Sequence, residues 1–426
     1  MAVLVVQHVA EEGPYEIGSA LRAAGLAQRV CRVWEGDPLP EDLNGAEALV
    51  VLGGPMSEHS DDGFPTRTAE LGLLRAALEA QVPVLGVCLG ARLLAVAAGG
   101  TARPGNGIEV GWGPVRGESA AGDPLFAGLP EQPRVLHGHG DTLDLPAGAA
   151  RSAARDRSPV RAFRVGAAAW GLQFHVETDA AAVDTFATAF PEEAAVAPGL
   201  CEDALAEPAV LAPYRDGVLV RFAALAAARA GYTSTRTFFT PRARTWEERF
   251  AGDGPVYAAA VARMGLGAGQ TVLDLGCGTG RALPALRAGV ADNGAVLAVD
   301  VTPAMLAAAA GYGRADLAVL LLADACHLPL PSGTVDGIFS AGLLNHIPEP
   351  APALREWARV TAPGGTLLLF HPSGRVERAA RHGRPLDPDD PLAETNLRPA
   401  LEAAGWRLAR YEDAHHHFLA RAVRVG

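Results

Sequence analysis

Short apolar runs that are typical of strands alternate with longer Ala/Leu-rich stretches, and this alternation occurs twice along the chain. The first series extends from Met1 to about Phe190, and the second from about Val272 to Gly426. Several apolar runs end at glycine, a residue that marks turns between strands and helices. Alternating strand and helix patterns predict an α/β fold in each half of the chain.

The length of the chain agrees with two domains, because 426 residues are too many for one hydrophobic core. We place these domains at residues 1–235 and 236–426, with the core of the first inside residues 1–190 and closing helices after it. The segment TSTRTFFTPRAR has the Pro and Thr content that is typical of a linker, so we expect the domain boundary there. Residues 246–264 have a helical pattern and are expected to cover one edge of the second sheet.

Composition and charge exclude several classes of protein. The formal net charge of −12 and the absence of a basic cluster argue against a nucleic-acid partner. All 36 basic residues are Arg, so the chain lacks the lysine of a pyridoxal phosphate Schiff base or of an ATP-binding P-loop. No apolar run approaches the roughly 18 residues of a membrane span, and the first residues do not resemble a signal peptide. We therefore expect a cytoplasmic protein without a membrane partner.

The five cysteines are odd in number and include no C-x-x-C pair, which argues against a disulfide framework or a zinc site. One of them, Cys88, lies in a pattern of its own. The run VPVLGVCLGARLLAVAAGG predicts a buried strand, a turn at Gly86 to Gly90 and a helix. A G-x-nucleophile-x-G elbow needs glycines because its turn is sharp, and it presents the nucleophile at the N-terminus of the next helix. That helix end favours the reactive thiolate.

A lone cysteine is more often a small buried hydrophobic residue, so a nucleophilic Cys88 requires a base elsewhere in the chain. The segment WGLQFHVE supplies one, since His175 and Glu177 are two residues apart and therefore point to the same side of a strand. Upstream, Gly53 and Gly54 follow the predicted strand ALVVL and offer bare backbone amides of the kind that form an oxyanion hole. Together these residues predict cysteine-dependent acyl chemistry.

The order and spacing of these elements resemble the class I glutamine amidotransferases, especially their GMP-synthase-like branch, over residues 1–190. Secondary motifs of that branch are also present, namely GGPMS, EVGW, HGD and WGLQFHVE. The resemblance implies a flavodoxin-like mixed sheet. It makes Cys88 the nucleophile, His175 the general base and then acid, and Glu177 the residue that orients His175. It also assigns the oxyanion to the backbone amides of Gly54 and Leu89.

The resemblance further implies that a small carboxamide loses ammonia, which a separate synthetase would receive. Two positions depart from the family pattern near the substrate, because Arg92 stands where glutamine is usual and Arg161 lies in a segment expected to resemble N-Q-A-F. If both guanidiniums line the pocket, the substrate is expected to carry an additional anionic group. No metal site is expected, and we interpret His137 and His139 as structural.

The second half contains a glycine-rich turn. The run TVLDLGCGTG predicts a strand, the turn and a helix, with glycines at 276, 278 and 280. Arg281 occupies the place of the third glycine in a G-x-G-x-x-G dinucleotide motif, which argues against a nicotinamide site. Twenty residues after Gly280, a predicted strand ends at Asp300, a carboxylate placed to accept hydrogen bonds from a ribose diol. This pattern predicts a nucleoside-binding site.

With Asp324 at a further strand end and Pro363-Gly364-Gly365 before another strand, this half resembles the class I methyltransferases of the small-molecule type over about residues 238–426. The resemblance implies a Rossmann-like seven-stranded fold and S-adenosylmethionine as the cofactor. The residues that it implies around the cofactor are Asp274, Gly276, Cys277 and Gly278 for the methionine part, Asp300 for the ribose, and Asp324 and Ala325 for the adenine. Cys277 is then a loop residue and not a nucleophile.

Two functions remain open from the sequence. The first is a bifunctional enzyme that acts on small molecules, with Cys88 chemistry in the first domain and methyl transfer in the second. The alternative is a methyltransferase whose first domain is a non-catalytic binding or regulatory module. The intact Cys88, His175 and Glu177 favour the first hypothesis, and the substitutions at Arg92 and Arg161 give weight to the second.

Overall fold

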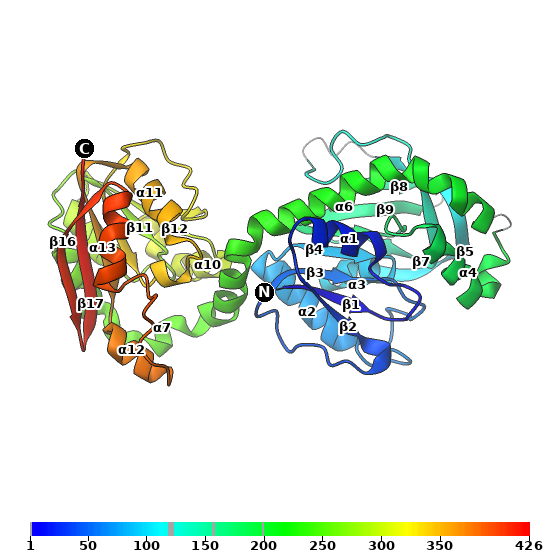
Figure 1. Cartoon of the computed structure of the whole chain (residues 1–426), viewed down its shortest axis with the longest axis horizontal. Helices are drawn as coiled ribbons and strands as arrows, with labels where there is room; N and C mark the ends of the chain where they lie inside the picture. The colour runs from blue at the N-terminus through cyan, green and yellow to red at the C-terminus, as the bar shows by residue number, and fades with distance from the viewer. Residues whose placement is uncertain (1, 118–122, 156–157, 198–199) are drawn as a thin grey trace. The chain divides into compact units, whose positions relative to one another are not determined.

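The computed structural model describes residues 2–117, 123–155, 158–197 and 200–426 (Figure 1). Contacts between Cα atoms divide the chain into two compact units, Met1–Thr237 and Phe238–Gly426. The sequence placed the domain boundary near residue 235. Each unit is built around its own β-sheet, so the α/β class predicted for both halves is confirmed.

The first unit is built on a mixed sheet of eight strands. These strands are β1 (Ala2–Gln7), β2 (Gln28–Arg32), β3 (Ala46–Val51), β4 (Val84–Val87), β6 (Arg116–Gly117), β8 (Ala150–Arg155), β9 (Ser158–Val165) and β10 (Ala169–Leu172). Their order is β2-β1-β3-β4-β10-β9-β8-β6, and the strands from β2 to β10 in that order are parallel. The remaining three pair antiparallel, which gives the predicted flavodoxin-like mixed sheet. A separate antiparallel ribbon joins β5 (Thr101–Pro114) and β7 (Arg134–Asp144).

Helices cover both faces of this sheet (Figure 1). They are α1 (Tyr15–Ala23), α2 (Arg67–Ala80), α3 (Leu89–Ala97), α4 (Ala180–Ala189), α5 (Pro191–Ala194) and α6 (Leu200–Phe239). On one face, apolar side chains of α1 and α6 pack with Trp170 and Phe174, all of them buried. On the other face, α2 and α3 pack against alternate residues of the same strands. Because parallel strands are buried on both sides, β1, β3 and β4 are almost continuously apolar.

The second unit has a sheet of seven strands, as predicted. These strands are β11 (Thr271–Leu275), β12 (Ala295–Asp300), β13 (Val319–Leu322), β14 (Val335–Ala341), β15 (Thr361–His371), β16 (Trp406–Ala414) and β17 (His417–Arg424). Their order is β13-β12-β11-β14-β15-β17-β16. The first five are parallel, and β17 and β16 close the edge as an antiparallel hairpin. The strand order reverses next to β11, which is where ligands bind in open α/β sheets.

The helices of the second unit also form two layers. They are α7 (Trp246–Arg249), α8 (Gly254–Ala262), α9 (Leu283–Val290), α10 (Pro303–Gly311), α11 (Pro350–Val360), α12 (Arg375–Arg381) and α13 (Glu394–Ala403). Buried residues of α8 and α9 pack with Val272 and Leu368 on one face of the sheet. Buried residues of α11 and α13, with Trp357 at the centre, cover the other face.

The segment expected to be a linker is helical instead. Its TSTRTFF part completes α6, and its TPRAR part forms the short 3-10 helix η2 (Thr240–Thr245). The threonines are compatible with a helix because the hydroxyl of Thr233 donates to the carbonyl of Arg229, and that of Thr237 to Ser234. Pro241 lies in the first turn of η2, where a backbone N–H has no partner within the helix. Thr and Pro content alone therefore gave a wrong prediction of the local structure.

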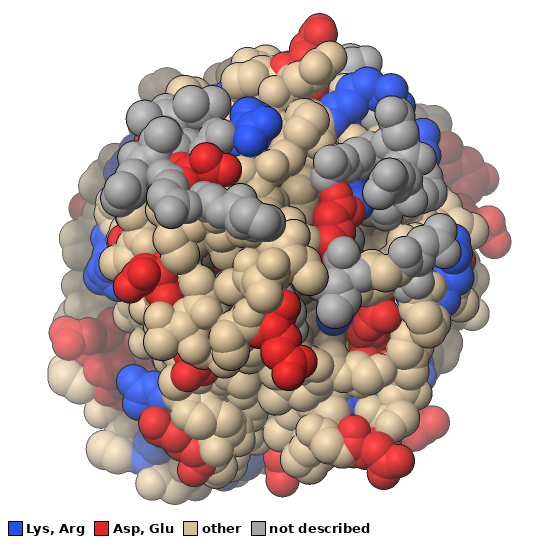
Figure 2. Space-filling view, turned by 90° about the vertical axis from the view of Figure 1, so that its right-hand side faces the viewer, with Lys and Arg blue, Asp and Glu red and all other residues tan. Residues whose placement is uncertain are grey.

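The surface charges are mixed. In a view of the first unit, Arg side chains lie interspersed with Asp and Glu, without a continuous basic patch on that face (Figure 2). None of the described helices, the 40-residue α6 included, combines the length and the apolar character that a membrane crossing needs.

Candidate active sites

Cys88 lies between β4 and α3, at the turn that the sequence predicted. Its backbone has a φ of 50° and a ψ of −104°, a conformation that is strained for a residue with a side chain. The flanking glycines make the turn possible. A Cβ at Gly86 would lie 2.5 Å from the carbonyl oxygen of Gly90, and one at Gly90 would lie 2.0 Å from that of Val51. The structure therefore has a nucleophile elbow, with Cys88 directly before the first turn of α3.

His175 and Glu177 follow β10 and lie beside Cys88. His175 is hydrogen-bonded through Nδ1 to Glu177 Oε1 at 2.6 Å, and its backbone N–H donates to Leu136. Burial alone would lower the pKa of His175, but the charge of Glu177 and hydrogen bonds with Cys88 and Glu177 raise it well above 6.5. The Cys88 thiol also contacts the carbonyl of Gly138, at 3.5 Å. Cys88, His175 and Glu177 thus form one chain of interacting side chains, in which His175 and Glu177 are hydrogen-bonded.

The two residues predicted to bind an oxyanion lie near this chain. Among the described residues, the backbone amides of Gly54 and Leu89 donate to no backbone carbonyl, and Leu89 is the first residue of α3. A buried histidine fixes the loop at Gly54. His8 is hydrogen-bonded through Nδ1 to the carbonyl of Gly53 at 2.9 Å and through Nε2 to Glu70 at 2.8 Å. Burial opposes protonation of His8, but the contacts with Glu70 raise its pKa.

A cavity of about 200 Å³ opens beside Cys88. Its lining residues are Glu12, Gly54, Pro55, Met56, Ser57, Cys88, Arg92, Val110, Gly138, Gly140, Asp141, Phe186 and Phe190. Arg92 lines the cavity, and its Nε donates to Glu58 Oε2 at 2.8 Å. Arg161 is 1% exposed, is paired with Glu109, and is not among these lining residues. Because each guanidinium is already neutralised by a carboxylate, the two Arg residues give no reason to expect an anionic substrate.

Glu12 is a pocket residue that sequence reasoning missed. It lies in the loop after β1, and its Oε2 is shielded from solvent without a hydrogen-bond partner among the described residues. A Cβ at Gly53 would lie 1.8 Å from this oxygen and 3.3 Å from Cε1 of His175, so a larger residue there would displace the carboxyl group from this position. Burial raises the pKa of Glu12. A charged residue in an irregular loop gives no pattern that could have indicated this position.

In the second unit, the glycine-rich turn follows β11 as predicted. Gly276, Gly278 and Gly280 have φ values of 70°, 55° and 81°, which favour glycine. A Cβ added at Gly278 would meet no atom within 4 Å, so the backbone there is open to a ligand. Asp300, at the end of β12, holds the turn because its Oδ2 accepts the N–H of Gly278 and its Oδ1 that of Thr302, both at 2.8 Å.

Asp274 is the most perturbed carboxyl group of this site. It is 2% exposed, and its Oδ2 has no hydrogen-bond partner among the described residues. Burial, and then the nearby charge of Asp300, raise its pKa to about 8. A buried carboxyl group without a partner, which a nearby positive charge would ionise, fits a ligand with an ammonium group, such as the methionine part of S-adenosylmethionine.

The other predicted cofactor residues lie on the loops around β11 and β13. The pKa of Cys277 is raised well above its usual value by burial and then by Asp300 and Asp274, so Cys277 remains a thiol and is a poor nucleophile. Asp324 accepts the N–H of Cys326 at 2.8 Å and contacts His327 at 3.1 Å. The carbonyl of Ala325 accepts a hydrogen bond from Trp357 at 3.0 Å. These contacts fix the loop after β13.

Glu247 is a second residue that the sequence did not indicate. It lies in α7, inside the segment expected to cover a sheet edge, and it accepts a hydrogen bond from Thr279 of the glycine-rich turn. Arg314 and Arg281 pair with the same carboxylate at 3.0 and 3.3 Å, and these bonds hold its pKa below the usual value although burial opposes this. The contact fastens α7 to the turn.

The folds and sites define two kinds of enzyme-like unit, one with a cysteine elbow and one with a nucleoside-type glycine turn. Comparison with known families agrees, since residues 15–188 match the glutamine amidotransferase class-I family and residues 273–369 match a methyltransferase domain family. The chain therefore contains a class I glutamine amidotransferase domain followed by a methyltransferase domain.

Individual relatives match one half each. A glutamine-hydrolysing GMP synthase of Porphyromonas gingivalis is 34% identical over 149 residues, which are 34% of this chain and 28% of that protein. A glutamine amidotransferase structure from Thermotoga maritima is 30% identical, with 52% of this chain and 98% of that chain covered and a TM-score of 0.49. The structure of an S-adenosylmethionine-dependent methyltransferase from Aquifex aeolicus is 31% identical. The match covers 40% of this chain and 89% of that chain, with a TM-score of 0.35. The chain thus spans less than a third of the length of the GMP synthase that it matches.

Proposed function

We propose that the first unit hydrolyses a small carboxamide, with glutamine as the first candidate, and that the second transfers a methyl group from S-adenosylmethionine. The observation that carries the first part is the chain of interacting side chains from Cys88 through His175 to Glu177 at a strained elbow. The strained backbone is hard to explain for a cysteine that only fills space.

The chemistry follows from this geometry. The Cys88 thiol passes its proton to His175 as its sulfur attacks the carboxamide carbon, and the amides of Gly54 and Leu89 stabilise the negative charge on the carbonyl oxygen. His175 gives its proton to the leaving nitrogen, so the C–N bond breaks, ammonia leaves and a thioester remains on Cys88. A water molecule that His175 deprotonates then cleaves the thioester and regenerates the thiol. Glu177 keeps His175 oriented throughout.

In the second unit, the residues present fit S-adenosylmethionine. Asp274 would bind the ammonium of its methionine part, Asp300 would accept hydrogen bonds from the ribose, and the loop at Asp324 and Ala325 would lie against the adenine. The bound cofactor supplies an electrophilic methyl group. Transfer of that group mainly requires positioning, so the fixed turn at Gly276 to Gly280 and its contact with Glu247 are the protein's contribution.

The partner of the first unit would be a synthetase on a separate chain that receives the ammonia, because a methyltransferase does not consume it. The GMP synthase relative supports the ammonia-releasing part of this proposal, since it is described as glutamine-hydrolysing. The substrates of both units would be small molecules.

Trapping of Cys88 tests the hydrolase proposal. A chloroketone analogue of glutamine should alkylate Cys88, and excess glutamine should protect it. The exposed Cys201 serves as an internal control for non-specific labelling, which glutamine should not change. Ammonia release should occur in the wild type and be absent in Cys88→Ala. Labelling without any ammonia release from carboxamides would instead support a non-catalytic binding module.

A further inference from the structure

Glu12 is a carboxyl group at the pocket of the first unit that the proposed chemistry does not use. Its half-buried side chain lines the cavity together with Cys88 and Gly54. Its Oε2 is shielded from solvent and has no hydrogen-bond partner among the described residues. A shielded carboxyl group without a partner is costly, and a donor on a bound molecule would reduce that cost. The group therefore points to a ligand with N–H or O–H groups.

The loop that carries Glu12 is fastened before this residue. The side-chain amide of Gln7 donates to the carbonyls of Val9 and Ala10, at 2.9 and 3.3 Å. Gln7 is itself buried at the end of β1. These bonds fix the path of the chain as it leaves the sheet.

After Glu12, the loop is joined to a residue of the proposed catalytic machinery. The hydroxyl of Tyr15 donates to the carbonyl of Glu11, and the φ of Tyr15 is 32°, which is strained for a residue with a side chain. The backbone N–H of Glu16 donates to the carbonyl of Glu177 at 3.1 Å. The loop is therefore held at both ends, so it presents Glu12 to the cavity in a fixed position.

Glu12 lies on the side of the pocket where His175 acts. A Cβ added at Gly53 would lie 1.8 Å from Glu12 Oε2 and 3.3 Å from His175 Cε1, so these two atoms are at most 5.1 Å apart. Cε1 is bonded to Nε2, the ring nitrogen that does not contact Glu177. One nitrogen atom about 3 Å from both Nε2 and the Glu12 carboxyl group can bridge such a separation. Burial raises the pKa of Glu12 and the charge of His175 opposes this rise, so the two groups interact.

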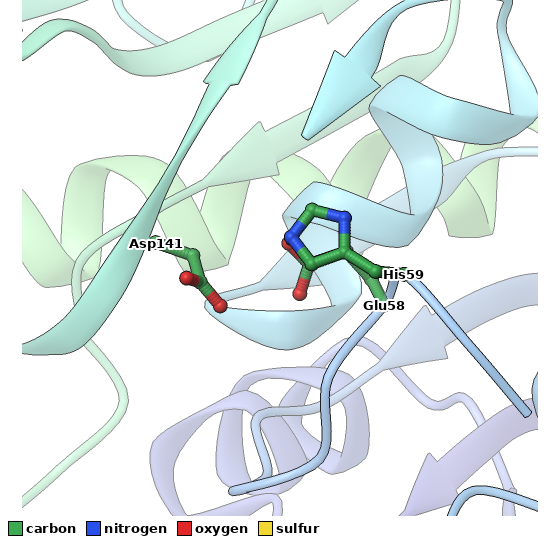
Figure 3. A group of neighbouring side chains, drawn as sticks. All are labelled: Glu58, His59 and Asp141. Atoms are coloured by element: carbon green, nitrogen blue, oxygen red, sulfur yellow. The ribbon is translucent and has the colours of Figure 1, made fainter. Parts of the chain in front are cut away.

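Other charged groups of the cavity belong to a separate cluster. Arg92 is paired with Glu58 at 2.8 Å. The ligand-type atoms of Glu58, His59 and Asp141 lie within 4.8 Å of one another, and these side chains face a common space (Figure 3). Glu12 lies outside this cluster. It is thus the acidic group of the lining that lies beside the catalytic histidine.

We propose that the carboxyl group of Glu12 accepts a hydrogen bond from the leaving nitrogen of the carboxamide and orients this nitrogen toward His175. In the tetrahedral intermediate the nitrogen carries two hydrogens and a lone pair. With one N–H held by Glu12, the lone pair faces the N–H of His175, which transfers its proton as the C–N bond breaks and ammonia leaves. This inference rests on the proposed hydrolase function and adds a catalytic residue to it.

An amide and an ester of the same acid separate this role from a structural one. L-Glutamine and L-glutamic acid γ-methyl ester would form the same thioester on Cys88, but only the amide has N–H groups on its leaving atom. Glu12→Leu should lower kcat/KM for L-glutamine about 30-fold, as expected for loss of a charge-assisted hydrogen bond, and leave that for the ester within about twofold. Glu12→Gln, which keeps one oxygen acceptor, should fall between the wild type and Glu12→Leu. Glu11→Leu, at a carboxylate of the same loop outside the cavity lining, should change neither substrate.

Binding to the full-length Cys88→Ala protein tests the same contact without any turnover. In titration calorimetry, a further Glu12→Leu substitution should weaken L-glutamine about fivefold or more and leave the affinity for the γ-methyl ester within about twofold. The retained ester affinity would also show that the pocket is intact.

Several results would overturn the proposal. These are an equal loss for amide and ester in Glu12→Leu, which would mean a structural role, an unchanged affinity for L-glutamine, or no binding of L-glutamine at all. The hydrolase proposal is tested separately by ammonia release from the wild type. A Glu12-dependent affinity for the amide without ammonia release would contradict the hydrolase and keep the contact. Ammonia release that Glu12→Leu leaves unchanged would do the reverse.

Discussion

Replacement of Asp274 by Asn should stabilise the second unit near neutral pH while it weakens cofactor binding. In the folded protein the carboxyl group keeps its proton up to about pH 8, whereas the ordinary value of 3.8 applies to the unfolded chain. Between these values the folded state binds the extra proton, so its stability falls as the pH rises from about 4 to about 8. With about 1.36 kcal/mol per pH unit, the wild type loses on the order of 4 kcal/mol by pH 7 but only about 1 kcal/mol by pH 4.5.

Asn does not titrate, so Asp274→Asn should lack this loss. The buried amide has its own cost of about 1–3 kcal/mol, but this cost is the same at every pH. The free energy of unfolding of the variant, relative to that of the wild type, should therefore increase by about 3 kcal/mol from pH 4.5 to pH 7. Scanning calorimetry of the full chain measures it, in the transition that added S-adenosylmethionine shifts in the wild type. A variant whose stability changes with pH in parallel with the wild type, to within about 1 kcal/mol, would refute the reasoning.

Three further predictions concern the rest of the molecule. Asp300→Ala removes both the ribose acceptor and the bond to Gly278, so affinity for S-adenosylmethionine in calorimetry should fall by on the order of 2 kcal/mol; unchanged affinity would contradict the site. Glu177→Gln removes the charge that raises the pKa of His175, so ammonia release should drop on the order of 100-fold or more, and a rate close to wild type would show that Glu177 is dispensable. Fragments 1–237 and 238–426 should each be folded by circular dichroism, because each has its own sheet; aggregation of both would show that the units depend on each other.

The sequence predicted those parts of the fold and sites that depend on local patterns. The elbow at Cys88, the pair of His175 and Glu177 and the turn at Gly276 to Gly280 each lie within a short segment, where glycine spacing or strand periodicity determines the geometry. The two sheets followed from the same periodicity. The helical end of α6 and the following η2 were not predicted, because Thr and Pro can occur in helices. The hydroxyl of Thr233 bonds to a carbonyl of its own helix, and Pro241 lies in a first helical turn, where its missing N–H has no effect.

The residues that the sequence missed come together only in three dimensions. Glu58 and His59 meet Asp141 from a segment about 80 positions away, and Glu247 reaches Thr279 from another element. No periodicity connects such positions. Arg92, four residues after Cys88, indicated an anionic substrate from the sequence alone. In the structure its guanidinium is paired with Glu58, so this indication no longer holds.

The close approach of backbone atoms at Gly86 and Gly90 gives a criterion for judging divergence in related proteins. Because a methyl group at either position would overlap a carbonyl oxygen, the elbow cannot survive a change there, whichever catalytic side chains remain. A change at either glycine would therefore abolish the proposed hydrolysis even where Cys88, His175 and Glu177 are retained. A related protein that retained all three side chains but carried alanine at either glycine would lack the proposed activity, and its intact Cys, His and Glu would conceal this loss.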